Sequence, residues 1–478
     1  MNKRAKKTKV IATLGPASST KEIMLELVKA GADVFRINFS HADYELVKRN
    51  VDIIREINQE YGYNISILGD LQGPKLRVGV VKEGSFLNPG DVLTFTNEPC
   101  EGDSTKVFMT YEKFPQDVKV GERILIDDGK LVFEVIETNQ KDTVKAKTIQ
   151  GGPLSSKKGV NLPNTNVSLP ALTEKDIDDA KFMIENEFDW IALSFVRHAQ
   201  DIIDLKKLIQ AHSDFKIPII AKIEKPEGVK NIDEILLECD GLMVARGDLG
   251  VEVPMEEVPV IQKKLVDKAR YYSKPVIIAT QMMETMISSL TPTRAEVNDV
   301  ANNVLDGADA VMLSGETSVG KYPVDVVKNI TKIIKNIEST NLYEKKNDII
   351  EKITCVDDRF VTDMVCLNAV KIAETTGAAA IITLTHSGYT AFQISAHRPT
   401  SRIIVYSSNR RVLTMLNLLW GVRAFYYDMN KSTDETVIQV NMLTHHYGYV
   451  EKGDFVVNLN AMPVYEGGKT NTLRLTTI

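Results

Sequence analysis

The stretch Ile217-Pro-Ile-Ile-Ala-Lys222-Ile-Glu224 is a short β-branched, apolar run that ends in a lysine and a carboxylate. Residues two apart in a strand point to the same side, so Lys222 and Glu224 leave the end of the predicted strand together. A fixed cation beside a carboxylate that can bind a metal suits a reaction that moves charge on a phosphoryl group or an enolate. The run therefore predicts a catalytic strand end.

Similar β-rich runs alternate with amphipathic helical stretches on both sides of this one. Eight strand–helix units can be read, and their strands are predicted at Thr8–Leu14, Val34–Phe39, Ile65–Asp70, Trp190–Val196, Pro218–Ile223, Gly241–Ala245, Pro275–Thr280 and Ala310–Leu313. Such alternation favours a parallel sheet, and eight units favour a closed (β/α)8 TIM barrel over an open sheet.

Two segments depart from this alternation. Residues from about Gly73 to Val167 read as all-β, with turn sequences such as Asn88-Pro-Gly-Asp, and a small open α/β pattern begins near Asn347. The sequence thus predicts an α/β protein of three parts. These are a catalytic barrel of residues 1–72 and 168–346, an inserted β-barrel lid domain of residues 73–167, and a C-terminal open α/β regulatory domain of residues 347–478.

The composition excludes several classes of function. The 478 residues are 43% hydrophobic and carry a net charge of −6, which is ordinary for a globular protein and does not favour a nucleic-acid partner. No apolar run approaches the ~20 residues that span a bilayer, and no apolar segment of a secretion signal follows the basic start. Four scattered cysteines without a CxxC pair are typical of reduced thiols. We expect a cytoplasmic protein that binds neither membranes nor nucleic acid.

Polar side chains follow six of the predicted strands, where a barrel enzyme gathers its active site. They are Arg36, Asn38, Ser40 and His41 after the second strand, Asp70 after the third, Lys222 and Glu224 on the fifth, Arg246 and Asp248 after the sixth, Thr280 and Gln281 after the seventh, and Ser314 and Glu316 after the eighth. Scattered surface polarity would rarely coincide with six strand ends, so we expect one shared site.

Glu224 and Asp248 are hard oxygen ligands on neighbouring strands, which suits Mg²⁺ or Mn²⁺. The alternative for these carboxylates is a salt bridge to Lys222 or Arg246. Arg36 and Arg246 can each bind a phosphate or carboxylate through two hydrogen bonds.

Three other groups keep a structural alternative open. Arg246 can instead pair with Glu316 or Asp70. Thr280 can relay a proton or simply bond to the backbone, and His41 can be structural or contact a nucleotide.

Taken together, these strand ends resemble the pyruvate kinase family. The matching segments are spread over nearly the whole chain at Lys9–Pro16, Arg36–His41, Ser155–Pro163, Ile219–Glu224, Met243–Glu252, Ala279–Met283, Pro292–Ala301 and Leu313–Thr317. The resemblance implies a barrel with a mobile lid, a C-terminal regulatory domain and a homotetramer. It also implies phosphoryl transfer from phosphoenolpyruvate to ADP, giving pyruvate and ATP, a reaction that needs positioning and charge neutralisation.

The resemblance also implies roles for single residues around phosphoenolpyruvate. Glu224 and Asp248 would hold the divalent metal, and Lys222 would neutralise the phosphoryl group in transfer and the enolate. The backbone of Ala245 and Gly247, with Thr280, would bind the carboxylate.

The same resemblance assigns the phosphate groups of the substrates. Arg36 would bind the phosphate of phosphoenolpyruvate. Arg77, His41 and the lid residue Lys158, with Asn38, would contact the phosphates of ADP or ATP.

A monovalent-cation site is the first departure from the family pattern. Many members hold K⁺ with residues that match Asn38, Ser40 and Asp70 and with the backbone carbonyl at Leu71. Members that depend on K⁺ have a glutamate where this chain has Lys75. A cation at this position would disfavour the ion, so the sequence resembles a potassium-independent branch in which Lys75 replaces K⁺.

The second departure concerns the effector. Thr385, Ser387, Gly388 and Thr390 lie where a helix follows a strand and can form a phosphate cradle, although a simple turn or helix cap is the alternative. Tyr389 replaces a basic residue of some members, and the loop Glu466–Asn471 is short. This disfavours fructose 1,6-bisphosphate and predicts a monophosphate effector, either a sugar phosphate or AMP.

Two other functions remain alternatives. One is a metal-dependent aldolase or lyase that acts on a pyruvate enolate, although the lid cations Arg77, Lys157 and Lys158 argue for a nucleotide substrate. The other is a catalytically degenerate family member that senses metabolites. A member that had lost its activity would be expected to have lost catalytic residues as well, yet Lys222 and Thr280 are both present.

Overall fold

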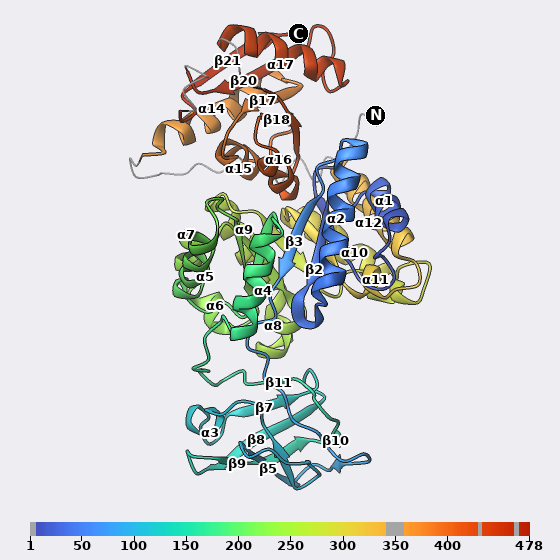
Figure 1. The fold of residues 1–478 in the computed structure, drawn as a ribbon, viewed down its shortest axis with the longest axis vertical. Helices are drawn as coiled ribbons and strands as arrows, with labels where there is room; N and C mark the ends of the chain where they lie inside the picture. Colours follow the sequence, from blue (N-terminus) through green and yellow to red (C-terminus); the bar gives the residue numbers. More distant parts are fainter. Residues whose placement is uncertain (1–5, 341–357, 429–432, 463–467) are drawn as a thin grey trace.

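The computed structural model describes residues 6–340, 358–428, 433–462 and 468–478, apart from the side chains of His41 and Thr433. Along the long axis of the molecule, the C-terminal domain lies at one end, the barrel in the middle and the inserted lid at the other end (Figure 1). The predicted boundary between residues 346 and 347, and Cys355, lie outside the described residues.

Eight parallel strands close into a barrel, as the sequence predicts. In order around the barrel they are β1 (Lys9–Thr13), β2 (Val34–Asn38), β3 (Ser66–Asp70), β12 (Trp190–Leu193), β13 (Ile219–Ile223), β14 (Gly241–Ala245), β15 (Val276–Ala279) and β16 (Ala310–Leu313), which pairs with β1. Nearly all their residues are buried, because helices cover the outside and side chains fill the interior.

Helices surround the barrel in its outer layer. They are α1 (Lys21–Ala30), α2 (Tyr44–Tyr61), α4 (Glu174–Glu185), α5 (Ala199–His212), α6 (Pro226–Lys230), α7 (Ile232–Glu238), α8 (Arg246–Glu252), α9 (Val258–Tyr271), α10 (Arg294–Asp306), α11 (Gly315–Ser318) and α12 (Pro323–Glu338), with the short 3₁₀ turns η1 (Phe39–His41), η2 (Met255–Glu257) and η3 (Glu284–Ile287). Local sequence sets their ends. Helix α10 begins at a capping box of Thr293 and Glu296 and ends at Gly307, whose φ of 99° favours glycine.

Four aspartates cap the strands at the amino end of the barrel, which we call the barrel floor. Each lies one residue before the second, fourth, sixth or eighth strand, and its carboxylate accepts a hydrogen bond from the backbone N–H of the strand before it. The pairs are Asp33 with Val10, Asp189 with Ile67, Asp240 with Ile219 and Asp309 with Val276, at 2.9, 2.7, 3.1 and 3.0 Å. The backbone N–H of each aspartate donates to the carbonyl of the same partner.

The lid has its own apolar core, separate from that of the barrel. A six-stranded sheet in the order β11-β7-β8-β9-β5-β6 and a two-stranded sheet β10-β4 form it. The elements are β4 (Phe86–Leu87), β5 (Val92–Thr96), β6 (Lys106–Phe108), the helical turn α3 (Phe114–Asp117), β7 (Arg123–Ile126), β8 (Leu131–Thr138), β9 (Thr143–Gln150), β10 (Gly152–Pro153) and β11 (Val160–Asn161). Arg77 pairs with Gly159 beside β11 and Val78 with Met109 beside β6, so this segment links both edges of the sheet.

The C-terminal domain is an open α/β sheet in the order β19-β18-β17-β20-β21, with only β21 antiparallel. Its elements are α14 (Phe360–Thr376), β17 (Ala380–Leu384), α15 (Tyr389–Ala396), β18 (Arg402–Ser407), α16 (Arg410–Met415), η4 (Leu416–Leu418), β19 (Val422–Tyr426), α17 (Thr433–His446), β20 (Phe455–Asn460) and β21 (Thr472–Thr477). Apolar periodicity alone would continue the helix that begins at Arg410 as far as Trp420, and it does not single out β19 or β21. The helix ends early because Leu416–Leu418 tighten into a 3₁₀ turn against the barrel.

The C-terminal domain is docked on the barrel floor. Arg398 and Asp309 form a buried ion pair at 2.7 Å, and the ring nitrogen of Trp190 donates to the carbonyl of Met415. Lys9, at the start of β1, is fully buried and its ammonium donates to the carbonyl of Val422 at 2.9 Å. In the residues described, no helix is long and apolar enough to cross a membrane.

Candidate active site

Lys222 lies at the centre of the polar groups that the strand ends bring together. Its ammonium is 3.0 Å from Asp70 Oδ1 and 3.1 Å from Glu224 Oε1, and it donates to the hydroxyl of Ser194 at 2.6 Å. Burial opposes the charge on Lys222, but the carboxylates of Asp70 and Glu224 outweigh burial and raise its pKa. The ammonium therefore stays charged at neutral pH.

Asp70 joins this lysine to Arg36. The side chain of Asp70 is 1% exposed, and its Oδ2 accepts from Arg36 Nε at 2.7 Å and lies 2.6 Å from a terminal guanidinium nitrogen. Burial alone would raise the pKa of Asp70, but the charges of Lys222 and Arg36 lower it. Arg36 also donates to the hydroxyl of Thr13 at 3.1 Å, so its guanidinium is held at a strand end with one edge directed to a carboxylate.

Glu224 is buried and lies on the other side of the lysine. Its Oε2 accepts from the backbone N–H of Phe195 at 2.7 Å. Burial, with the nearby charge of Asp248, raises the pKa of Glu224 above its ordinary value. The mutual repulsion of the two carboxylates marks an excess of negative charge beside the cavity that Asp248 lines, and a divalent cation would relieve it.

Thr280 follows β15 in a strained conformation that places its side chain beside α8. Its φ is 67° and that of Gln281 is 52°, which is unusual for residues with a Cβ. Thr280 Oγ1 accepts from the backbone N–H of Gly247 at 2.8 Å. A Cβ at Gly247 would lie 3.3 Å from that oxygen, so the close approach favours glycine there.

Arg246 holds this turn and does not pair with Glu316 or Asp70, the two partners considered from sequence. Its guanidinium donates to Asp299 Oδ1 at 2.7 Å and to the backbone carbonyl of Thr280 at 2.8 Å. Glu316 instead accepts backbone N–H groups from Met283 and Ser314.

Sequence reasoning missed Ser194 and Thr13. The predicted fourth strand ran on to Val196, which placed Ser194 inside it, whereas β12 ends at Leu193. Thr13 was likewise placed inside a strand predicted to reach Leu14. If the two strands had been predicted to end at Thr13 and Leu193, both hydroxyls would have been recognised as groups at strand ends.

The expected monovalent-cation residues are satisfied within the protein. Asn38 accepts from the backbone N–H of Ser40 at 3.1 Å, Asp70 pairs with Arg36 and Lys222, and the carbonyl of Leu71 accepts from the hydroxyl of Ser194 at 2.7 Å.

Lys75 is exposed, and the described residues give its ammonium no contact with Asn38, Ser40, Asp70 or Leu71. Lys75 lines the cavity between lid and barrel, and its expected role in place of K⁺ stays a prediction.

The residues expected at the nucleotide are split between lid and barrel. Arg77 donates to the carbonyl of Lys157 at 3.1 Å, and Lys158 is 3.0 Å from Asp127, so both belong to the lid. Asn38 is exposed at the end of β2, and the side chain of His41 lies outside the described residues.

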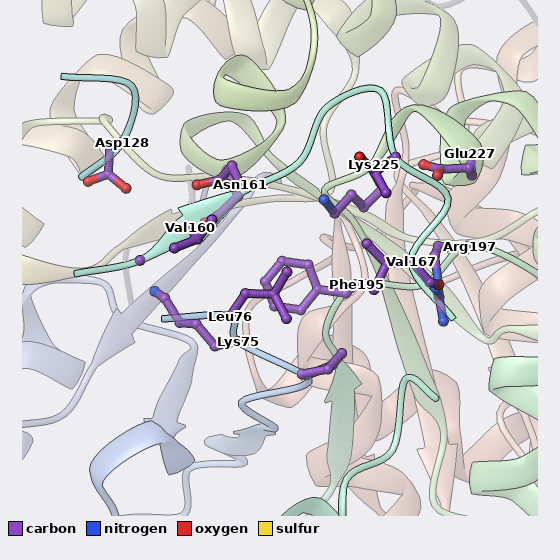
Figure 2. Close-up of a pocket in the computed structure, with 14 residues that line it drawn as sticks. Lys75, Leu76, Asp128, Val160, Asn161, Val167, Phe195, Arg197, Lys225 and Glu227 are labelled. Atoms are coloured by element: carbon purple, nitrogen blue, oxygen red, sulfur yellow. The ribbon is translucent and has the colours of Figure 1, made fainter. Parts of the chain in front are cut away.

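A cavity with about 650 Å³ of empty space, part of it open to solvent, separates the lid from the barrel. Its lining combines lid residues such as Lys75, Val160 and Asn161 with the barrel residues Phe195 and Lys225, and Figure 2 shows the ring of Phe195 in the middle of this lining. At the carboxyl end of the barrel, Glu252 accepts a hydrogen bond from Asn161 of β11 at 2.8 Å and another from Lys225 at 2.6 Å. This three-residue contact, which we call the lid latch, ties lid and barrel together.

The expected effector residues line a separate recess in the C-terminal domain, with about 800 Å³ of empty space that includes open solvent. Thr385, Ser387 and Thr390 contribute hydroxyls, and Arg359 and Lys469 contribute cations. The hydroxyl of Thr385 accepts from the backbone N–H of Gly388 at 2.9 Å, as in the turn considered from sequence.

Tyr389 and the terminal loop bound this recess. The hydroxyl of Tyr389 donates to Asp363 at 2.8 Å, and Arg359 lies over its ring. Residues 466 and 467 of the short loop lie outside the described residues.

Comparisons with known proteins agree with this layout. Two family models match, "Pyruvate kinase, barrel domain" over residues 5–327 and "Pyruvate kinase, alpha/beta domain" over residues 363–476. Pyruvate kinase 2 of Synechocystis is 42% identical over 95% of this chain and 76% of its own length, and pyruvate kinase of Mycobacterium intracellulare is 40% identical over 98% of both chains. The crystal structure of a pyruvate kinase from Cryptosporidium parvum superposes with a TM-score of 0.92 at 33% identity, covering 99% of this chain and 97% of that one.

Proposed function

This chain belongs to the pyruvate kinase family, whose members transfer the phosphoryl group of phosphoenolpyruvate to ADP, and from that premise we propose which residues carry the reaction. The observation that supports the assignment is the Lys222 ammonium held between two carboxylates at the carboxyl ends of β3 and β13. Lys222 neutralises the phosphoryl group in transfer and the charge that develops on the enolate oxygen. Such preorganised charge is the main contribution a protein makes to this kind of transfer.

The family generally requires Mg²⁺, and we propose that Glu224 and Asp248 hold Mg²⁺ or Mn²⁺ in this chain. The two residues fit a divalent cation because both present carboxylate oxygens, and because burial, with the nearby charge of Asp248, raises the pKa of Glu224, so a cation would stabilise its charged form. The cation, when bound, supplies charge neutralisation on substrate oxygens. Phe195 orients Glu224 through its backbone N–H to Oε2. Glu224 Oε1, which lies 3.1 Å from the Lys222 ammonium, and the Asp248 carboxylate would then face the cation.

The carboxylate of phosphoenolpyruvate is bound, in our proposal, by Thr280 and the backbone of Ala245 and Gly247. In the free protein, Thr280 and Gly247 are bonded to each other, so a carboxylate would replace that bond. Arg36 binds the phosphate, because its guanidinium lies on Asp70 beside Lys222. Helix α8 begins at Arg246, and its amino end favours an anion there.

ADP lies between lid and barrel in this proposal. Arg77 and Lys158 contact its phosphates from the lid, and Asn38 and His41 from the end of β2. A lid that moves toward the barrel would bring these groups together and exclude water.

We also propose that this chain does not require K⁺, although the family usually does. Asn38, Asp70 and the carbonyl of Leu71, three of the four ligands expected for the ion, already have partners in the protein, and Arg36 and Lys222 supply the positive charge next to Asp70. This support is independent of Lys75, on which the sequence argument depended.

For regulation, we propose that a phosphate monoester, either a sugar phosphate or AMP, binds the recess of Thr385, Ser387, Gly388 and Thr390. Tyr389 occupies part of the recess and is held by Asp363, which leaves less room for a second phosphate. We further propose that the active form is a homotetramer in the cytoplasm.

The boundaries drawn between the three parts belong to this proposal too. The break at 72/73 is supported by Leu71, which belongs to the barrel core, and Leu76, which belongs to the lid core. Near 167/168, Leu169 still packs on the lid core and Ala171 is the next residue of the barrel core, which supports a change within a few residues of this break.

One assay tests these assignments. ATP formation from phosphoenolpyruvate and ADP is followed in a coupled assay for wild type and for Lys222→Met, with Mg²⁺, with and without K⁺, and with glucose 6-phosphate, AMP or fructose 1,6-bisphosphate. We expect Lys222→Met to lower turnover at least about 10³-fold while calorimetric phosphoenolpyruvate binding persists. Normal turnover of Lys222→Met would contradict the role of this lysine.

The other arms of the assay test the ions and effectors. Strong activation of wild type by K⁺ would contradict potassium independence. A response to fructose 1,6-bisphosphate alone would contradict a monophosphate effector.

A further inference from the structure

The hydroxyl of Ser194 lies between the Lys222 ammonium and the backbone carbonyl of Leu71. Lys222 Nζ donates to Ser194 Oγ at 2.6 Å, and Oγ donates to the carbonyl oxygen of Leu71 at 2.7 Å. An ammonium has only donors and a carbonyl only accepts, so the single hydroxyl proton must point to Leu71. The chemistry of the three groups thus fixes the direction of both bonds.

The position of Ser194 leaves this hydroxyl little freedom. The residue directly follows β12 and is 1% exposed. Phe195 after it has a φ of 54°, and its N–H is bonded to Glu224. Gly73 of the loop after β3 approaches so closely that a Cβ there would lie 2.9 Å from the Cβ of Ser194. The loop that carries Leu71 is therefore packed against the end of β12.

The Lys222 ammonium has three oxygen atoms within 3.1 Å. Two belong to the carboxylates of Asp70 and Glu224, and the third to the neutral hydroxyl of Ser194. A bond between two ions is stronger than one between an ion and a neutral hydroxyl. When a phosphoryl oxygen arrives, the bond to Ser194 is the one that Lys222 gives up most easily.

We propose that Ser194 is a positioning residue for Lys222, whose hydroxyl holds the ammonium in place until a phosphoryl oxygen replaces it. By the same hydrogen-bond chain Ser194 connects the Lys222 ammonium to the carbonyl of Leu71, in the loop that follows β3. This inference rests on the proposed role of Lys222 in phosphoryl transfer. It adds a residue of the fourth strand to a site that the other strand ends surround.

The test compares Ser194→Ala with Ser194→Thr, which keeps a hydroxyl. Ser401→Ala is the matched control, because it removes another buried hydroxyl that donates to a carbonyl, that of Ala378 at 2.6 Å, in the C-terminal domain. We expect Ser194→Ala to lower kcat about 10- to 100-fold, the cost of a misplaced catalytic group, with the half-saturating phosphoenolpyruvate concentration within about threefold. Ser194→Thr should regain most of kcat, and Ser401→Ala should stay within about twofold of wild type.

A second readout does not depend on activity. The midpoint of thermal unfolding is measured in KCl and in choline chloride at equal ionic strength. We expect the midpoints of wild type, Ser194→Ala and Ser194→Thr to lie within about 4 °C of one another in both salts, because Asp70 stays paired with Arg36 and Lys222. A loss of kcat in Ser194→Ala then reflects the position of Lys222 and not a loss of the fold.

The results separate this inference from the proposed function. A kcat of Ser194→Ala within about twofold of wild type, or a kcat that Ser194→Thr does not recover, would overturn the inference. If Lys222→Met also turned over normally, the proposed role of the lysine would fail as well. An inactive Lys222→Met beside a normal Ser194→Ala would reject the role of Ser194 alone.

Discussion

Thr280 is held in a backbone conformation that few residues adopt. A β-branched residue with φ of 67° carries strain on the order of 1–3 kcal/mol. The guanidinium of Arg246 offsets it by binding the carbonyl of Thr280, while Asp299 holds the guanidinium in place. Arg246 therefore acts on the substrate site through the backbone of the next strand end.

We expect Arg246→Met to release this turn and to lower kcat about 10- to 100-fold, because the hydroxyl of Thr280 loses its fixed position. Steady-state kinetics with varied phosphoenolpyruvate measure the effect. Arg55→Met is the control, because it removes an arginine from Asp189 on the barrel floor. A large rise in half-saturating phosphoenolpyruvate with unchanged kcat would mean instead that Arg246 binds the substrate directly.

Because Lys222 and Asp70 are ion-paired, their contributions to the unfolding free energy change only at high pH for Lys222 and at low pH for Asp70. The pKa of Lys222 is raised above 10.5, so its contribution is complete below 10.5 and is lost as pH rises through the higher folded value. The pKa of Asp70 is lowered below 3.8, so its contribution is present above 3.8 and is lost as pH falls through the lower folded value.

We therefore expect the difference in unfolding free energy between wild type and Lys222→Met to stay constant from pH 7 to 10. At lower pH the difference also reflects Glu224, because removing Lys222 raises the pKa of that buried carboxyl further. Urea titrations from pH 7 to 10 measure the difference. A difference that fell steadily between pH 7 and 10 would show that Lys222 loses its proton within that range.

At the level of elements, strand periodicity predicted the barrel, because eight buried runs with helices between them leave few other arrangements. It predicted which strand ends meet, and Lys222, Glu224, Asp70 and Arg36 do lie together. It could not locate strand ends to within a residue, and this is why Ser194 was missed. The partner of Arg246 was also missed, since Asp299 lies in the middle of a helix that pattern alone assigns to the outer layer.

The lid latch is a contact between elements that sequence patterns do not predict. Glu252 of α8 is buried and binds Asn161 of β11 together with Lys225. We expect Asn161→Ala to loosen the lid, so that amide hydrogen exchange rises in β11, while kcat changes no more than about threefold.

Hydrogen-exchange mass spectrometry of the whole chain makes this measurement. Asn139→Ala is the control, since Asn139 bonds to Asp142 within a lid turn. Unchanged exchange at β11 in Asn161→Ala would mean that the latch does not hold the lid.

At the scale of the molecule, α15 connects the recess of the C-terminal domain to the barrel floor. Its first residues line the recess, and near its other end Gln393 accepts from Ser273 and Phe392 packs on Trp190. Arg398 then reaches Asp309, which also caps β15. A shift of α15 would thus act directly on the strand that leads to Thr280.

Without the ion pair of Arg398 and Asp309, the barrel and the C-terminal domain should no longer unfold together. We expect Arg398→Met to lower the unfolding free energy by about 3–5 kcal/mol, because it leaves a buried carboxylate without its cation. Calorimetry should then show the barrel and the C-terminal domain melting apart. The control Arg474→Met breaks the exposed pair with Asp434 and should cost less than about 1 kcal/mol. Equal effects of both variants would contradict the role of the buried pair.

The four aspartates of the barrel floor also bear on ancestry. Asp33, Asp189, Asp240 and Asp309 recur once in every two strands, each with the same reciprocal pair of bonds to the strand before it. A barrel that grew by duplication of a two-stranded unit would retain one such mark in each copy. Each such pair of neighbouring strands thus has its own aspartate and its own two hydrogen bonds. A circular permutation that placed new chain ends between two such pairs would keep all four aspartates bonded to their strands.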